Sequence, residues 1–244
     1  WRGDFMLKKL FIFSMILFTL PFNILYAYAG DEDSLENSDN KEKIVYLTFD
    51  DAPSKTVFKD ILDILKKEDV RATFFVIGNQ VKGNEEILKR AYDEGNSIGL
   101  HSFTHEKKNL YTSNEKFLDE MLTTQKAIED VIGCSPKILR FPFGANNSFY
   151  KLKKDLVKLL HDNDLRIYDW NADSGDGLNP HLSPSRILKN SKSDKDTVVL
   201  LMHASPLHKN TAKALPDIIA YYKAKGYTFK TIDCKTPEVF KYIK

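Results

Sequence analysis

The sequence predicts an α/β fold, and within that class a single-domain (β/α) barrel that is incomplete or distorted at seven strands. Short runs of β-branched and aromatic residues alternate with segments of helical periodicity over residues 44–233. Strict alternation of this kind indicates parallel strands joined by right-handed crossovers, with the helices outside the sheet. A doubly wound open sheet is the alternative arrangement.

Each predicted element rests on its own pattern. Buried strands are predicted at 44–50, 71–78, 97–103, 137–143, 165–171, 197–203 and 228–233. Helical spacing of apolar residues is found at 55–69, 84–96, 114–133, 149–164, 183–190 and 214–226. Asn84 and Ser113 are expected N-caps, and Gly95 is an expected helix stop.

The composition is that of a soluble globular domain. Hydrophobic residues make up 42% of the chain and charged residues 29%, with a formal net charge of +2. The chain has no basic stripe interleaved with aromatic residues, so no nucleic-acid partner is expected.

Residues 1–29 have the features of an export signal. Lys8 and Lys9 precede an apolar run, and Ala27-Tyr28-Ala29 is a small-x-small cleavage pattern. The alternative is an uncleaved membrane anchor, since the run is about long enough to span a bilayer. The prediction is therefore a secreted or cell-envelope protein, in contact with a membrane only if the segment is uncleaved.

Two further segments complete the organisation. Residues 30–43 are acidic and lack aromatic residues, which indicates a solvated linker before a folded domain at 44–244.

Cys134 and Cys234 permit a disulfide in an exported protein, but the sequence leaves open whether they meet. The chain is expected to be a monomer.

Polar residues fall where the predicted strands end. Since the carboxyl ends of parallel strands meet at one edge, we expect these side chains to converge on one site. They are Asp50, Asp51, His101, His105, Arg140, Asp169, Trp170 and His203.

Three of these residues are a plausible ligand set for a metal. His101 and His105 can share an ion if the backbone makes one helical turn between them, and Asp51 is the expected third ligand. Two imidazoles and one carboxylate leave positions open for water and substrate, as in catalytic sites.

Asp50 and Asp51 cannot both face the ion on a straight strand, because alternate residues point to opposite faces. A strand-to-turn corner at residues 50–53 would remove that restriction. Asp51 would then bind the ion, and Asp50 would stay free as a general base.

The same residues resemble the polysaccharide deacetylases, carbohydrate esterase family 4. The resemblance covers nearly all of residues 44–233. Its motifs are TFDDAP (48–53), HSFTH (101–105), RFPFG (140–144), DWNADSGDG (169–177) and LMH (201–203).

The resemblance implies a hydrolase that removes acetyl groups from N-acetylated sugar polymers, with a divalent metal as cofactor. Zn²⁺ is expected, with Co²⁺, Ni²⁺ or Fe²⁺ as alternatives. Asp51, His101 and His105 would hold the ion, and Asp50 would be the base. The other implied roles are those of His203 as acid, Arg140 in orienting Asp50, the Phe143 N–H as oxyanion donor, and Leu201 in an acetyl pocket.

The chain departs from the family pattern at several positions. Ala52 stands where glycine is usual, and Phe143 where the third motif usually has Tyr or Gly. In the fourth motif Gly177 stands where the family frequently has tryptophan. Trp170 would partly take the place of that tryptophan as a wall of the site. The carboxylate that tunes His203 is expected to be Asp173, with Asp176 as the alternative.

Three histidines, His161, His181 and His208, have no partner at a useful spacing and are expected to be exposed and structural. Ala204 follows His203 where the family commonly has aspartate.

The leading hypothesis is a deacetylase of peptidoglycan N-acetylglucosamine, because the DWN and RFP forms look like those of bacterial wall-acting members. Chitooligosaccharides or an exopolysaccharide are alternative substrates. Two other classes remain: a non-hydrolytic Fe(II) oxygenase built on the Asp-His-His set, and a catalytically silent glycan-binding protein.

Overall fold

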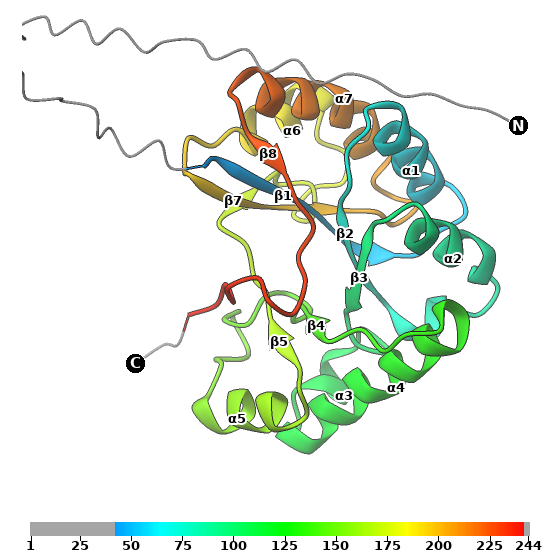
Figure 1. Cartoon of the computed structure of the whole chain (residues 1–244). Helices are drawn as coiled ribbons and strands as arrows, with labels where there is room; N and C mark the ends of the chain where they lie inside the picture. Colours follow the sequence, from blue (N-terminus) through cyan, green and yellow to red (C-terminus); the bar gives the residue numbers. More distant parts are fainter. Residues whose placement is uncertain (1–41, 242–244) are drawn as a thin grey trace, which may run out of the picture. The chain divides into compact units, whose positions relative to one another are not determined.

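The structure, a computed structural model, describes residues 42–241 of the chain. The predicted leader at 1–29 and most of the predicted linker lie outside the described residues. Within these residues one curled, wholly parallel sheet has helices around its outer side (Figure 1). The predicted α/β fold, an incomplete (β/α) barrel, is confirmed.

The sheet has eight strands in the order β5-β4-β3-β2-β1-β7-β6, and β8 pairs with β1. The strands are β1 (Ile44–Ala52), β2 (Thr73–Val76), β3 (Ser97–Leu100), β4 (Ile138–Leu139), β5 (Arg166–Ile167), β6 (Ala172–Asp173), β7 (Thr197–His203) and β8 (Thr228–Phe229). All seven predicted strands are present, most of them shorter than predicted, and β6 is additional. The sheet path of the described chain ends at β5 and β6, so the barrel stays open between these strands.

The helices follow the apolar periodicity of the sequence. They are α1 (Val57–Lys67), α2 (Glu85–Asp93), α3 (Lys107–Leu110), α4 (Asn114–Ile132), α5 (Lys154–Asp162), α6 (Pro184–Ser191) and α7 (Lys209–Ala224), with a 3₁₀ turn, η1, at Gly78–Gln80. Ser113 caps α4 as predicted, since its Oγ accepts a hydrogen bond from the Lys116 N–H. Asn84 is the N-cap residue of α2, but its side chain makes no capping hydrogen bond.

The two faces of the sheet belong to two different apolar clusters. Val45, Leu47 and Phe49 of β1 pack into the large core beneath the helices. Tyr46, by contrast, packs with Phe75 of β2 and other residues into a small cluster on the concave face. Because side chains alternate along a strand, Thr48 and Asp50 share the concave face with Tyr46.

The segment after β8 runs from the side of β1 to the side of β5 (Figure 1). Val239 pairs with Tyr168, and its carbonyl accepts a hydrogen bond from the Asp169 N–H. The Glu238 carboxylate accepts one from the Ile167 N–H at 2.6 Å. The chain after β8 therefore covers part of the open side of the barrel.

Two remaining expectations concern cysteines and membranes. Cys134 and Cys234 are both free and exposed, so they form no disulfide in this structure. In the part of the chain that the structure describes, no helix has the length and apolar character needed to cross a membrane.

Candidate active site

The site begins at a corner where β1 ends. Asp51 has a φ of +62°, which breaks the strand alternation and brings both Asp50 and Asp51 toward the concave edge. Ala52 is not among the described residues with positive φ. The corner therefore forms as predicted without a glycine at position 52, because the left-handed residue is Asp51.

His101 and His105 converge by a different route from the one predicted. Residues 101–106 contain no helical turn; Ser102 and His105 have φ values of +66° and +59°. The prediction of one helical turn was wrong. Two residues with left-handed backbone bring the two histidines together instead. The Ser102 hydroxyl holds this loop by accepting a hydrogen bond from the His105 N–H.

Glu120 of α4 braces the same loop and was missed from sequence. One carboxylate oxygen accepts hydrogen bonds from the backbone N–H groups of Phe103 and Thr104, at 2.9 and 2.7 Å. The carboxylate also accepts one from the Thr104 hydroxyl. Nothing in the helical pattern distinguishes Glu120 from the exposed acids beside it, since its role depends on where α4 packs.

Asp51, His101 and His105 form a cluster that fits a metal ion. The Asp51 Oδ1 atom lies 3.7 Å from the His101 Nε2 atom and 3.6 Å from the His105 Nε2 atom. That Oδ1 atom is buried and has no hydrogen-bond partner among the described residues. A buried carboxylate oxygen without a donor requires a cation or water, so the donor set fits a divalent ion.

The orientation of His101 and the protonation of His105 agree with this assignment. His101 Nδ1 lies 3.0 Å from the Arg140 carbonyl, which only accepts, so Nδ1 is the donor of this bond and Nε2 is the ring nitrogen that faces Asp51. Burial and the neighbouring His101 lower the pKa of His105 to about 4. His105 therefore offers a neutral nitrogen ligand at neutral pH, and His101 presents its Nε2 atom to the same carboxylate oxygen.

Asp50 lies beside this cluster with a different set of partners. Its Oδ1 atom accepts a hydrogen bond from Arg140 at 2.9 Å, and its Oδ2 atom lies 3.7 Å from His101 Nε2. Burial raises the pKa of Asp50, but the charges of Arg140, His101 and His203 outweigh burial and hold it below its ordinary value. Asp50 is thus an ionised acceptor next to the metal cluster.

Arg140 is fully buried and links three strands. Its guanidinium donates to Thr48 and Asp50 of β1 and to the Tyr168 and Asp169 carbonyls after β5. The structure brings Arg140 and Asp50 into direct contact, as the predicted orienting role requires, and that role stays a prediction. Because four acceptors surround one planar group, the position of Asp50 is fixed by the strand packing itself.

The partner of His203 is Asp176, so the prediction of Asp173 is wrong. Asp176 Oδ1 lies 2.8 Å from His203 Nδ1, and its Oδ2 atom accepts from the His203 N–H. Asp173 is exposed, and its carboxylate accepts from the Gly175 N–H. Burial lowers the pKa of His203, but Asp176 outweighs it and raises the pKa to about 9.

His208 is the second residue that the sequence reading missed. It is buried rather than exposed, and its ring stacks on His203 with centroids 4.9 Å apart and planes at 22°. Asp176, His203 and His208 also lie close enough to suggest a metal cluster. Because the His203 and His208 rings are nearly parallel, the lone pairs of their nitrogens lie in parallel planes. A nitrogen of His203 and one of His208 therefore do not converge on one ion.

The other predicted histidines differ from His208. His181 is exposed, as predicted. His161 is partly buried, and its Nε2 atom lies 3.0 Å from the Glu238 carboxylate, a partner that its spacing did not reveal.

Of the residues predicted to contact the substrate, Phe143 packs directly against the cluster. Phe143 has a φ of +65°, and its ring packs against His105 with centroids 4.8 Å apart. Leu201 is buried on β7, paired with Thr48, two residues before His203. Gly144 has a φ of +82°, and a Cβ there would lie 2.9 Å from Trp170, so only glycine suits this position.

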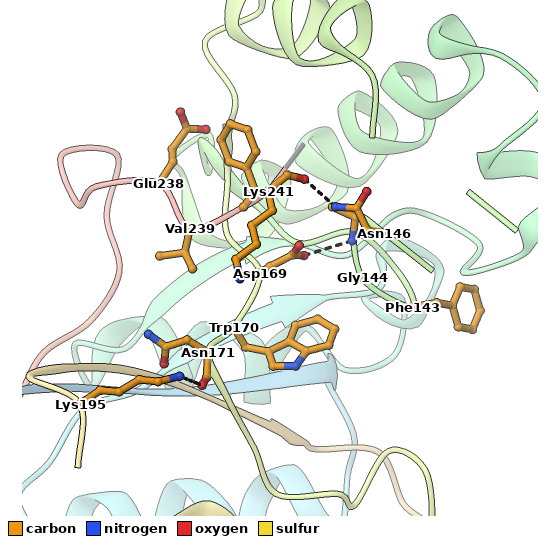
Figure 2. A pocket seen from close by; sticks show the side chains of 12 residues that line it. Phe143, Gly144, Asn146, Asp169, Trp170, Asn171, Lys195, Glu238, Val239 and Lys241 are labelled. Atoms are coloured by element: carbon orange, nitrogen blue, oxygen red, sulfur yellow. Dashed lines mark hydrogen bonds between the residues drawn. The ribbon is translucent and has the colours of Figure 1, made fainter. Parts of the chain in front are cut away.

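A pocket of about 700 Å³ adjoins the site at the open side of the barrel (Figure 2). Its lining includes Phe143, Trp170, Asn146, Lys195 and Lys241. Asp169, predicted to converge on the site, lines this pocket instead, and burial raises its pKa to about 6 although the Ala145 N–H donates to it.

Comparisons with known proteins agree with the fold and identify the family. Residues 37–162 match the family model described as polysaccharide deacetylase. A peptidoglycan-N-acetylglucosamine deacetylase of Bacillus cereus is 35% identical over 196 residues, which are 78% of this chain and 69% of that protein. The deacetylase PgdA of Listeria monocytogenes is 35% identical over 193 residues, but the match spans only 38% of its length.

Solved structures lead to the same family. A polysaccharide deacetylase of Bacillus cereus superimposes with a TM-score of 0.74 at 33% identity, covering 82% of this chain and 97% of the other. The catalytic domain of a peptidoglycan N-acetylglucosamine deacetylase from Eubacterium rectale gives 0.74 at 29% identity, covering 84% and 96%. The chain belongs to the polysaccharide deacetylase family, whose deacetylases are metal-dependent amide hydrolases.

Proposed function

We propose that this protein removes the N-acetyl group from N-acetylglucosamine residues of peptidoglycan, using one divalent ion, Zn²⁺ first among the candidates. The observation that carries the proposal is the juxtaposition of two groups of residues. Asp51, His101 and His105 offer a ligand set with an unpartnered buried oxygen, and the ionised Asp50 lies beside it without being needed as a ligand.

A divalent ion held by Asp51, His101 and His105 would lower the pKa of water and polarise the acetamide carbonyl. Asp50, which Arg140 holds in place, accepts the proton of the attacking water. The backbone N–H of Phe143 is the proposed donor to the oxygen that gains negative charge on attack. Leu201 and Trp170 are the proposed apolar walls around the acetyl group and the sugar.

Breakdown of the tetrahedral intermediate needs a proton, because an amine anion is a poor leaving group. His203 supplies it from Nε2, since Nδ1 is engaged by Asp176. A pKa of about 9 keeps this imidazole charged at neutral pH, as an acid requires. The products are acetate and a free amino sugar.

Two observations support a polymeric wall substrate. The relatives from Bacillus cereus, Listeria monocytogenes and Eubacterium rectale carry the name of this activity. The pocket beside the site also offers aromatic and amide groups, Trp170 and Asn146 among them, to a glycan that extends beyond the reacting sugar.

The proposed location is outside the cytoplasm, secreted or held at the cell envelope. Its support is the leader pattern of residues 6–29, two lysines and an apolar run ending in Ala27-Tyr28-Ala29. That is the compartment in which a peptidoglycan substrate is found.

Acetate release from a panel of substrates tests the proposal. Zinc-loaded protein is incubated with acetylated peptidoglycan, with chitooligosaccharides and with an acetylated exopolysaccharide, beside an Asp50→Asn variant. We expect release from peptidoglycan that requires Asp50. Release from chitooligosaccharides alone would move the substrate to that class, and the absence of release from every glycan would contradict the proposal.

A further inference from the structure

The orientation of His203 is determined by more than its hydrogen bond to Asp176. That bond fixes one ring nitrogen, Nδ1. The last side-chain torsion of histidine is broad, so one contact at the ring edge leaves the plane of the ring weakly defined. The proton for the leaving amine is carried on Nε2, and its direction depends on that plane.

Two further residues touch the ring, and both depart from what the sequence motifs led us to expect. His208 stacks on it, with centroids 4.9 Å apart. At Gly177 a Cβ would lie 2.4 Å from the His203 Cε1 atom and 3.0 Å from Nε2. Real Cβ atoms essentially never approach so closely, so any other residue at position 177 would displace the ring.

His208 is itself held firmly. It is only 6% exposed, and its Nδ1 atom lies 2.8 Å from the Ser205 hydroxyl. It immediately precedes α7, and Thr211 in the first turn of that helix donates to Asp176 Oδ2 at 2.7 Å. The start of α7 therefore braces both partners of His203, the stacked ring through His208 and the carboxylate through Thr211.

The charges fit a cation stacked on a neutral ring. Burial lowers the pKa of His208; Asp176 opposes this shift, and the charge of His203 adds to it. His208 is therefore uncharged where His203 is charged, and an aromatic face attracts a nearby cation. Two charged imidazoles at this separation would repel each other.

We infer that His208 is a positioning residue for the proposed deacetylation, which, together with the close approach of Gly177, sets the plane of the His203 ring so that Nε2 can protonate the leaving amine. The inference rests on the proposed function, in which His203 is the acid. It gives Gly177 a role of its own, since the loss of a side chain at that position makes room for the ring that His208 holds.

The test compares two substrates that differ in their need for an acid. An acetylated glycan amide needs its leaving nitrogen protonated, whereas the aryl ester 4-nitrophenyl acetate expels a stable phenolate without that proton. The variants are His208→Ala, which removes the stacked ring, and His208→Phe, which restores an aromatic face. Gly177→Ala disturbs the ring from its other contact, and His181→Ala is the matched control at an exposed histidine.

For His208→Ala we expect kcat on the amide to fall by about tenfold or more, with KM and the ester rate changed by less than about twofold. Gly177→Ala should show the same amide-selective loss, and His208→Phe should recover most of the amide rate. Metal content is measured in parallel and should match the unchanged protein.

Three results would overturn the inference. They are equal losses on amide and ester, a full amide rate in His208→Ala, or a His208→Phe variant as impaired on the amide as the alanine variant. A different result would reject the proposed function itself: no amide hydrolysis by the unchanged, metal-loaded protein. That result would remove this inference with it.

Discussion

Two carboxylates of this site, Asp50 and Asp176, differ in what compensates their burial. Asp50 is paired with the Arg140 guanidinium, the side-chain group that is not deprotonated in proteins in general. Asp176 is paired with an imidazole that titrates. The first arrangement keeps a base ionised, and the second keeps an acid protonated, so the two ends of the proposed reaction are set by the choice of partner.

Replacing Asp176 by Asn should change the pH dependence of deacetylation. The pKa of His203 is raised from 6.5 to about 9, so its acid form is lost as pH rises through about 9. Without the Asp176 carboxylate, burial is opposed only by the smaller effects of Asp50 and Asp51, and the alkaline limb of kcat/KM should move to lower pH. The measurement is kcat/KM against pH. Asp173→Asn is the control, and an equal displacement in both variants would contradict the assignment.

At the scale of elements, the loop that carries His105 depends on a helix. Ser102 and His105 adopt left-handed backbone, which costs free energy unless surrounding contacts enforce it. Glu120 of α4 supplies such contacts through the Phe103 and Thr104 N–H groups.

Glu120→Ala should therefore weaken metal binding without touching a ligand. We expect zinc affinity to fall by about tenfold, since groups that orient metal ligands typically have effects of this size. Competition with a chromogenic chelator measures the affinity. Asp119→Ala, at the exposed neighbouring acid of the same helix, should leave it unchanged, and a loss shared by both variants would assign the effect to α4 in general.

The Arg140 guanidinium links β1 to the backbone that follows β5, across the concave face of the sheet. Arg140→Met leaves Asp50 as an unpaired buried charge and should lower the free energy of unfolding by about 3–5 kcal/mol. Adding Asp50→Asn should recover part of that loss, because the uncompensated charge is removed. Urea denaturation measures both. The half-buried Arg166→Met is the control, and a loss of similar size there would show that the Arg140 effect is not specific to its ion pair.

Strand ends and motif residues could be predicted from the sequence, because alternation of buried strands and amphipathic helices places them at one edge. The choice between Asp173 and Asp176 could not, since both lie in or next to an irregular loop that has no period to show which carboxylate faces β7. His208 was missed for a related reason. Its contact with His203 depends on where α7 begins in space, and no spacing along the chain reports that.

For the whole molecule, a metal that binds three residues on two strand ends should stabilise the fold. Zinc at about a hundred times its dissociation constant should add about 2.7 kcal/mol to the free energy of unfolding. Thermal melts with zinc and with a chelator measure the difference. His105→Gln should melt at one temperature under both conditions, and an equal zinc effect in that variant would place the ion elsewhere.

The proposed mechanism depends on different roles for two neighbouring aspartates, Asp51 as metal ligand and Asp50 as general base. The most direct test is to strip the protein of metal, restore zinc in steps, and follow bound metal and acetate release together in the unchanged protein and in Asp50→Asn. We expect release to rise until one ion is bound per chain. Asp50→Asn should bind the same amount of zinc and release acetate at least about a hundredfold more slowly. Acetate release from the metal-free protein, or undiminished release by Asp50→Asn, would contradict the account.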